Sequence, residues 1–293
     1  MINEMLSMPF ITRALIVGVL VALCAALLGV SLVLKRYSMI GDGLSHVGFG
    51  TLAIALALDV VLHEMPLPAF LAFLRLPPGV SISPLLVSIP LVLLAAFLLL
   101  RISENSKIKG DAAIALISCS ALATGVIIVA KTKGMTADLC NYMFGSILAM
   151  KKDDLYLSIA VSVVVLILYV LFYNKIYAVT FDEKFAKATG TKTGLYNMLI
   201  ALLTALVIVV GMRMMGALLI SSLIIFPALT SMRVFKSFRN VVISSAILSV
   251  VCFIIGIVIS YAWENTPTGA IIVDVNLAAF LLFSAIGAIR KRA

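Results

Sequence analysis

The chain has 293 residues, of which 63% are hydrophobic and 12% are charged, and its formal net charge is +9. A soluble globular domain carries about 45–50% apolar and about 25% charged residues, so this composition argues against a soluble protein and indicates a multi-span membrane protein. No run of Lys and Arg with interleaved aromatic residues is present, so nucleic-acid binding is not indicated. Basic loops on the cytoplasmic side of a membrane account for the positive charge.

Nine apolar blocks reach, or nearly reach, the roughly 20 residues that a membrane-spanning helix needs. They are 10–34, 40–60, 84–100, 112–130, 154–174, 194–211, 214–232, 240–262 and 270–289. Residues 139–150 are apolar but too few for a span, and we expect them not to cross the membrane. The sequence therefore predicts an all-α integral membrane protein, with residues 1–293 forming one transmembrane domain of about eight or nine helices.

The basic residues give the expected orientation. If successive loops alternate sides and Lys35 and Arg36 lie inside, fifteen of the 22 Lys and Arg residues fall on the cytoplasmic side. This bias follows the positive-inside rule and predicts an external N-terminus and a cytoplasmic C-terminus. The assignment holds only if 139–150 does not cross, because a further crossing would turn most of the basic residues outward.

The second apolar block opens with GDGLSHVGFG (41–50), where an acid and an imidazole stand among apolar residues. Asp42 and His46 are four residues apart, so a helix presents them on one face. A carboxylate oxygen and an imidazole nitrogen suit zinc and manganese. In the alternative interpretation, Asp42 caps the start of the helix and His46 bonds to a neighbouring span.

One such pair is half of a cation site, because zinc takes about four ligands and manganese more. Two copies of the chain that meet across a two-fold axis would supply two acids and two imidazoles. Small residues would allow two such helices to approach closely. These are Gly41, Gly43, Gly48 and Gly50. Tight packing within one chain would use the same glycines, and both alternatives are open.

The longest expected cytoplasmic loop covers residues 175–193. Within it, FDEKFAKATG (181–190) has the pattern of a short amphipathic helix. One face of that helix would carry Phe181, Phe185 and Ala188. A helix this short is marginal in water and needs a surface to pack against. That surface is either the membrane interface or a cytoplasmic partner.

The ends of this short helix are also marked. Asp182 and Glu183 lie in the expected first turn, where acidic side chains suit the helix dipole. Gly190 is placed to end the helix.

Motifs that would indicate catalysis are missing from the sequence. There is no GxxxxGK[ST] phosphate-binding loop, no HExxH and no GxSxG. The chain is therefore not expected to be an enzyme or to hydrolyse ATP itself.

Six stretches resemble, in character and order, the membrane permease subunits of metal-ion ABC importers (the ABC-3 type, which handles zinc, manganese and iron). They are SMIGDGLSHVGFG (38–50), GDAAIAL (110–116), ADLCNYMFGSILA (137–149), FDEKFAKATG (181–190), GALLISSLIIFPALTS (216–231) and TPTGAIIV (266–273). The resemblance runs from about residue 8 to about residue 288. The Asp-x-x-x-His element is its most specific part.

The resemblance implies a type II ABC importer-like fold and a homodimer in the bacterial plasma membrane. Two cytoplasmic ATP-binding subunits and an extracellular metal-binding protein would be its partners. The family's pathway ligands map onto Asp42 and His46. Its contact with the ATPase maps onto Phe181, Asp182, Glu183, Phe185, Ala188 and Gly190. No permanent cofactor is expected, and the transported cation is expected to be zinc first and manganese next.

This chain departs from the family pattern in two places. Family members often have an alanine after the aspartate, where this chain has Gly43, and a proline in the stretch that here reads GFGTLA. Neither departure removes a ligand. The alternative function is an ion- or proton-coupled secondary transporter that uses Asp42 and His46 as a proton relay and needs no ATPase.

Overall fold

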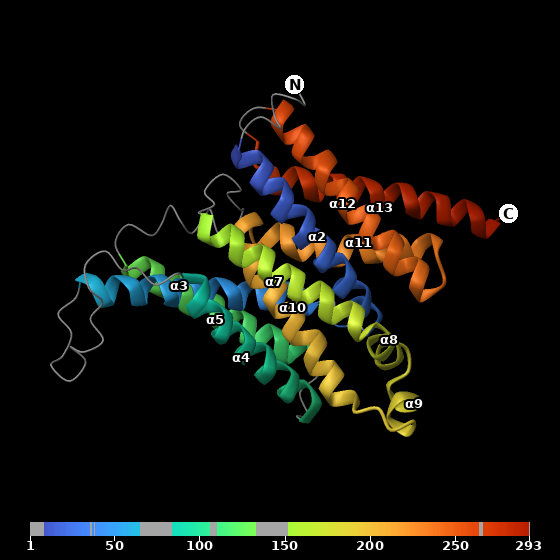
Figure 1. Ribbon diagram of the computed structural model, residues 1–293, viewed down its shortest axis with the longest axis horizontal. Coiled ribbons are helices and arrows are strands. Elements are labelled where there is room, and N and C mark those ends of the chain that lie inside the picture. Colours follow the sequence, from blue (N-terminus) through green and yellow to red (C-terminus); the bar gives the residue numbers. More distant parts are fainter. Residues whose placement is uncertain are drawn as a thin grey trace.

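All regular structure in the described part of the chain is α-helical (Figure 1). The computed structural model describes residues 9–35, 37, 39–64, 84–105, 110–132, 152–263 and 266–292. Its helices are α2 (Pro9–Leu34), α3 (Met39–Glu64), α4 (Pro84–Asn105), α5 (Gly110–Lys131), α7 (Lys152–Leu171), α8 (Tyr173–Phe181), α9 (Glu183–Ala188), α10 (Thr193–Met215), α11 (Ala217–Val234), α12 (Phe238–Ala262) and α13 (Thr268–Arg292).

Each of the nine predicted apolar blocks forms a helix. Within the described ranges, seven helices are long and apolar enough to cross a membrane, and α7 with α8, bent by 69°, makes an eighth if the pair is one span. The remaining block forms α4, whose apolar part, Val87–Leu99, is shorter than the apolar part of those seven helices. The prediction of an all-α, multi-span protein is confirmed. The segment 139–150, which we expect not to cross, lies outside the described residues.

Two predicted boundaries are wrong. The sequence predicts Arg213 between two spans, but this residue lies in the last turn of α10, and the break comes at Gly216. Gly216 has a φ of 88°, which glycine adopts without the steric cost that other residues incur. The first part of the predicted loop 175–193 is also helical, because α8 continues as far as Phe181.

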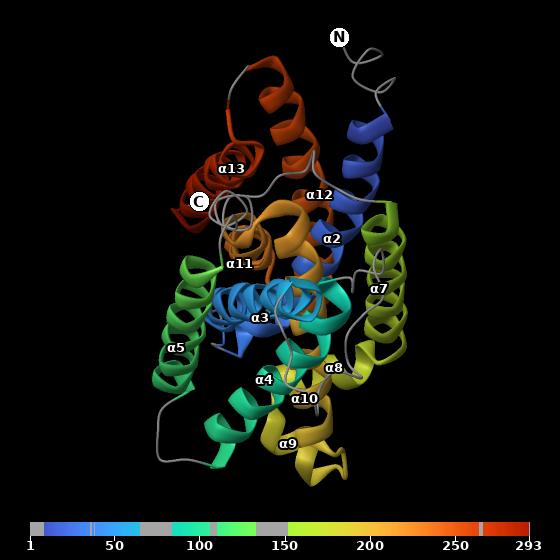
Figure 2. The ribbon, with the colours of Figure 1, turned by 90° about the vertical axis from the view of Figure 1, so that its left-hand side faces the viewer.

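The centre of the bundle is formed by α10 and α11, each of which packs against both α2 and α3. The long helices α5 and α13 lie at the outside, with most of their surface exposed. Figure 2 shows α3 in the middle of the molecule, with α5 on one side and α11 next to it. The sequence element that carries Asp42 and His46 is therefore held by several neighbours.

Small residues let these helices approach to backbone contact. A Cβ atom added at Gly29 of α2 would lie 1.9 Å from the carbonyl oxygen of Ile224 in α11. Ser249 of α12 donates a hydrogen bond of 2.9 Å to the carbonyl oxygen of Ala22 in α2. Such close contacts and interhelical hydrogen bonds stabilise helix packing in a membrane, where burial of apolar side chains gives little driving force.

Gly29→Ala should destabilise the bundle, because its new methyl group collides with the Ile224 carbonyl. Overpacking of this kind costs about 1–3 kcal/mol, so the purified variant should melt at a lower temperature than the wild type in the same detergent. Gly194→Ala is the matched control, because nothing lies within 4 Å of a Cβ atom there. An unchanged or raised melting temperature for Gly29→Ala would contradict the packing of α2 on α11.

Candidate functional site

Asp42 and His46 lie on one face of α3, close to its start. Oδ2 of Asp42 is 3.6 Å from Nε2 of His46. Two ligand atoms at about 2.0–2.1 Å from a tetrahedral zinc ion are themselves about 3.4 Å apart. The two side chains are 59% and 28% exposed, respectively. Their geometry therefore allows both to bind one cation with a small adjustment.

The alternative in which Asp42 caps the helix does not fit its position. The helix begins at Met39, so Asp42 is inside the first turn rather than at the N-cap. Its carboxylate can still interact favourably with the positive end of the helix dipole. Its carboxylate lies beside the imidazole of His46.

The neighbours of α3 leave this face open. Ser45, about 100° round the helix from His46, faces α11, where its hydroxyl oxygen lies 3.0 Å from that of Ser221. Gly43, about 100° from Asp42 in the other direction, faces α5, and a Cβ atom there would lie 2.5 Å from Ile114. The two candidate ligands therefore emerge between α11 and α5.

The glycines of this stretch pack inside the chain. A Cβ atom at Gly50 would lie 2.6 Å from the carbonyl oxygen of Ala121 in α5, and one at Gly48 would lie 3.1 Å from Met212 in α10. The remaining two, Gly41 and Gly43, meet side chains of α11 and α5. Helices of the same chain therefore cover these glycines, which favours the alternative of tight packing within one chain.

The described part of one chain supplies two candidate ligands at this position. Among the residues that the structure describes, no further His, Cys, Asp or Glu completes a group of three that could hold a metal ion. Lipid solvates a carboxylate and an imidazole poorly, so polar groups exposed on a membrane helix need water, a cation or another polar surface. Further ligands would have to approach through the open face between α5 and α11.

The predicted helix 181–190 is divided in two. Phe181 ends α8, and Asp182 adopts an extended conformation with φ −144° and ψ 95°. The carboxylate of Asp182 then caps α9 by accepting a hydrogen bond of 2.9 Å from the backbone N–H of Phe185. Gly190 follows α9 with a φ of 82°, in agreement with its expected place as a terminator.

The aromatic residues of this segment do not pack into the bundle. Phe181 and Phe185 are largely exposed, and so is Ala188. The residue that anchors α9 is Ala186, which is buried. An apolar surface at the end of the bundle is therefore left uncovered by the described residues of this chain.

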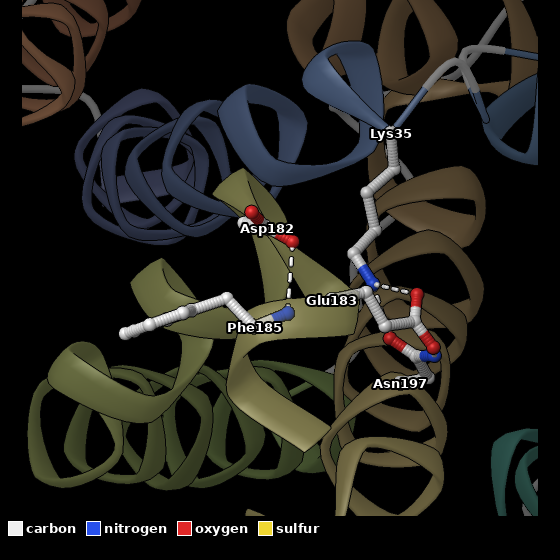
Figure 3. A network of polar contacts seen from close by, with 5 residues as sticks. All are labelled: Lys35, Asp182, Glu183, Phe185 and Asn197. Carbon is white, nitrogen blue, oxygen red and sulfur yellow. Dashed lines mark hydrogen bonds and ion pairs between the residues drawn. The ribbon is translucent and has the colours of Figure 1, made fainter. Parts of the chain in front are cut away.

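A polar network joins α9 to the rest of the bundle (Figure 3). Nζ of Lys35, which follows α2, lies 3.5 Å from Oε2 of Glu183 and donates a hydrogen bond to Oδ1 of Asn197 in α10. Nδ2 of Asn197 donates a hydrogen bond of 3.0 Å to Oε1 of Glu183. Three parts of the chain thus meet at one point, and the side chain of Phe185 points away from it.

The sequence pattern assigns no site role to Lys35 or Asn197. Lys35 enters the topology only as a loop charge, and nothing local relates it to Glu183, which lies 148 positions further along the chain. Asn197 carries a weak signal, since an amide early in an apolar span usually bonds to a neighbouring helix. The tertiary structure is needed to show which neighbour that is.

Comparison with known proteins gives a family for the whole chain. A model of the ABC 3 transport family matches residues 7–287. The chain is 30% identical to the manganese import system permease protein ScaB of Streptococcus gordonii over 273 residues, which cover 93% of this chain and 90% of that protein.

A zinc system and a solved structure are also similar to the chain. Identity to the high-affinity zinc uptake system membrane protein ZnuB of Haemophilus influenzae is 30% over 270 residues, which cover 92% of this chain and 94% of that protein. The structure described as PsaBC from Streptococcus pneumoniae in complex with Fab superposes with a TM-score of 0.79 at 28% identity. The superposition covers 97% of this chain and 95% of that chain.

Proposed function

Because the chain belongs to the ABC 3 transport family, we propose that it is the membrane permease subunit of an ATP-binding cassette importer for a divalent metal cation. The observation that carries the proposal is the Asp42–His46 pair on α3, whose ligand atoms are 3.6 Å apart and whose side chains are exposed and half-buried, respectively. Similar proteins are named for manganese and for zinc, and both metals accept these ligands. Zinc first and manganese next remains our prediction for this chain.

The proposed permease is a homodimer. Each copy would present Asp42 and His46 through the open face between α5 and α11, so two copies would supply two carboxylates and two imidazoles. Four ligands satisfy zinc, whereas two do not. The exposed carboxylate supports this arrangement, because a second polar surface or a cation would remove it from lipid.

The proposed partner at α9 is a cytoplasmic ATP-binding subunit. The chain carries no phosphate-binding loop, so ATP hydrolysis belongs to that separate subunit. Phe181 and Phe185 offer it exposed aromatic side chains, the residue type that often dominates binding energy at interfaces. An extracellular metal-binding protein would deliver the ion to the other end.

The proposed topology has the N-terminus outside and the C-terminus in the cytoplasm. Both views of the fold support the external N-terminus, because the start of α2 and α9 lie at opposite ends of the bundle. A helix that meets a cytoplasmic ATPase then requires α2 to begin on the external side.

The proposed mechanism is alternating access. Closure of the ATPase on ATP would push α9 and re-pack the spans, while Asp42 and His46 hold the cation transiently. A site with few or exchangeable ligands suits this role, because an ion in transit must leave as readily as it enters.

Asp42→Ala and His46→Ala should each lower cellular uptake of radiolabelled zinc or manganese to background, because the ion loses a ligand in a site that already has few. Assembly with the ATP-binding subunits should be unchanged, since neither residue belongs to α9. Uptake is measured in a strain that lacks its own copy of the permease. Rescue of that strain's growth by one ion and not the other identifies the metal.

Leu58→Ala is the control for these variants, because Leu58 is an exposed residue of the same helix that offers no ligand atom. It should transport normally. Wild-type uptake of both ions in both site variants would refute the site. Uptake that persists without the ATPase and collapses with the proton gradient would instead support the secondary transporter.

Phe185→Ser should weaken the complex with the ATP-binding subunit. Loss of an aromatic anchor costs about 2 kcal/mol, or about 30-fold in affinity, which affinity purification through a tagged permease can detect. Tyr156→Ser is the matched control, because Tyr156 is 69% exposed and Phe185 66%, but Tyr156 lies at the opposite end of α7 from α8. Equal recovery of the ATPase with both variants would exclude Phe185 from the interface.

A further inference from the structure

The polar network at α9 connects the proposed ATPase contact to the helix that carries the proposed metal ligands. Glu183 belongs to α9, and its carboxylate meets both Lys35 and Asn197. Lys35 immediately follows α2, and α3 begins at Met39. Asp42 lies in the first turn of α3. A short stretch of backbone therefore separates the network from the metal ligands.

The buried ammonium group of Lys35 depends on its ion pair with Glu183. Its side chain is 8% exposed, whereas that of Glu183 is 50% exposed. A buried ammonium group is costly without an opposite charge, and removing the partner of a buried ion destabilises the structure more than removing that of an exposed one. When α9 moves, Lys35 must therefore follow Glu183 or lose a favourable interaction.

Tyr37, between α2 and α3, is hydrogen-bonded to both helices. The N–H of Tyr37 donates a hydrogen bond of 2.9 Å to the carbonyl oxygen of Leu32, inside α2. The N–H of Ile40 in α3 donates one of 3.0 Å to the carbonyl oxygen of Tyr37. Tyr37 is thus bonded to both helices, and a displacement at the end of α2 is passed to the first turn of α3.

A second route leads to the same helix through α10. Asn197 is near the start of α10, and Met212 near its end packs against Gly48 of α3. An α-helix transmits a displacement along its axis because its backbone hydrogen bonds keep it stiff. Both routes end on α3, on either side of His46.

From this geometry we infer that Lys35, Glu183 and Asn197 are positioning residues that transmit movement of α9 to the Asp42–His46 pair. The inference rests on the proposed function, since it concerns how ATP hydrolysis is coupled to the same site. The three residues touch neither the cation nor ATP. Their loss should separate ATP hydrolysis from transport without removing either activity's own machinery.

The test uses the permease with its ATP-binding subunits and metal-binding protein in proteoliposomes. The measured quantity is the number of radiolabelled zinc or manganese ions taken up per ATP hydrolysed. Lys35→Met and Asn197→Leu should each lower this ratio about tenfold, within the usual range of energetic coupling between sites. ATP hydrolysis, co-purification of the ATPase and metal binding by the permease should stay near the wild-type values.

Further variants make the test specific. Lys35→Glu and Glu183→Lys should each lower the number of ions taken up per ATP. The double variant that carries both changes should raise this number again, because the opposite charges are restored, and a double-mutant cycle measures the gain. Lys192→Met is the control, because Lys192 is an exposed lysine at the start of α10 and makes no side-chain capping hydrogen bond there. It should keep the wild-type ratio.

The outcomes separate the inference from the proposed function. An unchanged ratio in Lys35→Met and Asn197→Leu, measured beside a wild-type system that transports, would overturn the link alone. A variant that loses the ATPase from the purified complex to the same extent as it loses transport would also overturn the link. The network would then only hold α9 in place. Wild-type proteoliposomes that take up neither ion would overturn the proposed function and the link with it.

Discussion

An exposed carboxylate and a half-buried imidazole on an otherwise apolar helix are the constraint that the proposed site has to meet. Asp42 and His46 lie within 3.6 Å of one another on a face of α3 that neither α5 nor α11 covers. Lipid solvates such groups poorly, so this face requires water, a cation or a second polar surface. The proposed permease, in which two copies of the chain would share a divalent cation, would meet this requirement with the residues present.

The packing around α3 limits how that site can change. The glycines of α3 let α5 and α10 approach so closely that side chains of ordinary size would collide, and Ser45 is bonded to Ser221 in α11. Close-packed interiors have few arrangements of similar energy. A force applied at α9 would therefore move whole helices rather than single side chains. The ion pair between Lys35 and Glu183 lies where a movement of α9 would reach the junction between α2 and α3.

Much of the fold could be predicted from the sequence, because apolar length alone identifies helices that cross a membrane, and all nine apolar blocks are helical. Asp42 and His46 were identifiable because helical spacing places them on one face. The bend after Leu171, the break at Gly216 and the burial of Ala186 were not, since each depends on what packs nearby. The glycines were ambiguous for the same reason: a small side chain indicates a close approach but does not name the partner.

The number of metal ions bound per chain tests most directly whether two copies share the Asp42–His46 site. Equilibrium dialysis of the purified permease against radiolabelled zinc measures it. A shared site predicts one ion for every two chains, with that binding lost in Asp42→Ala. One ion bound to each chain, and retained in Asp42→Ala, would contradict it.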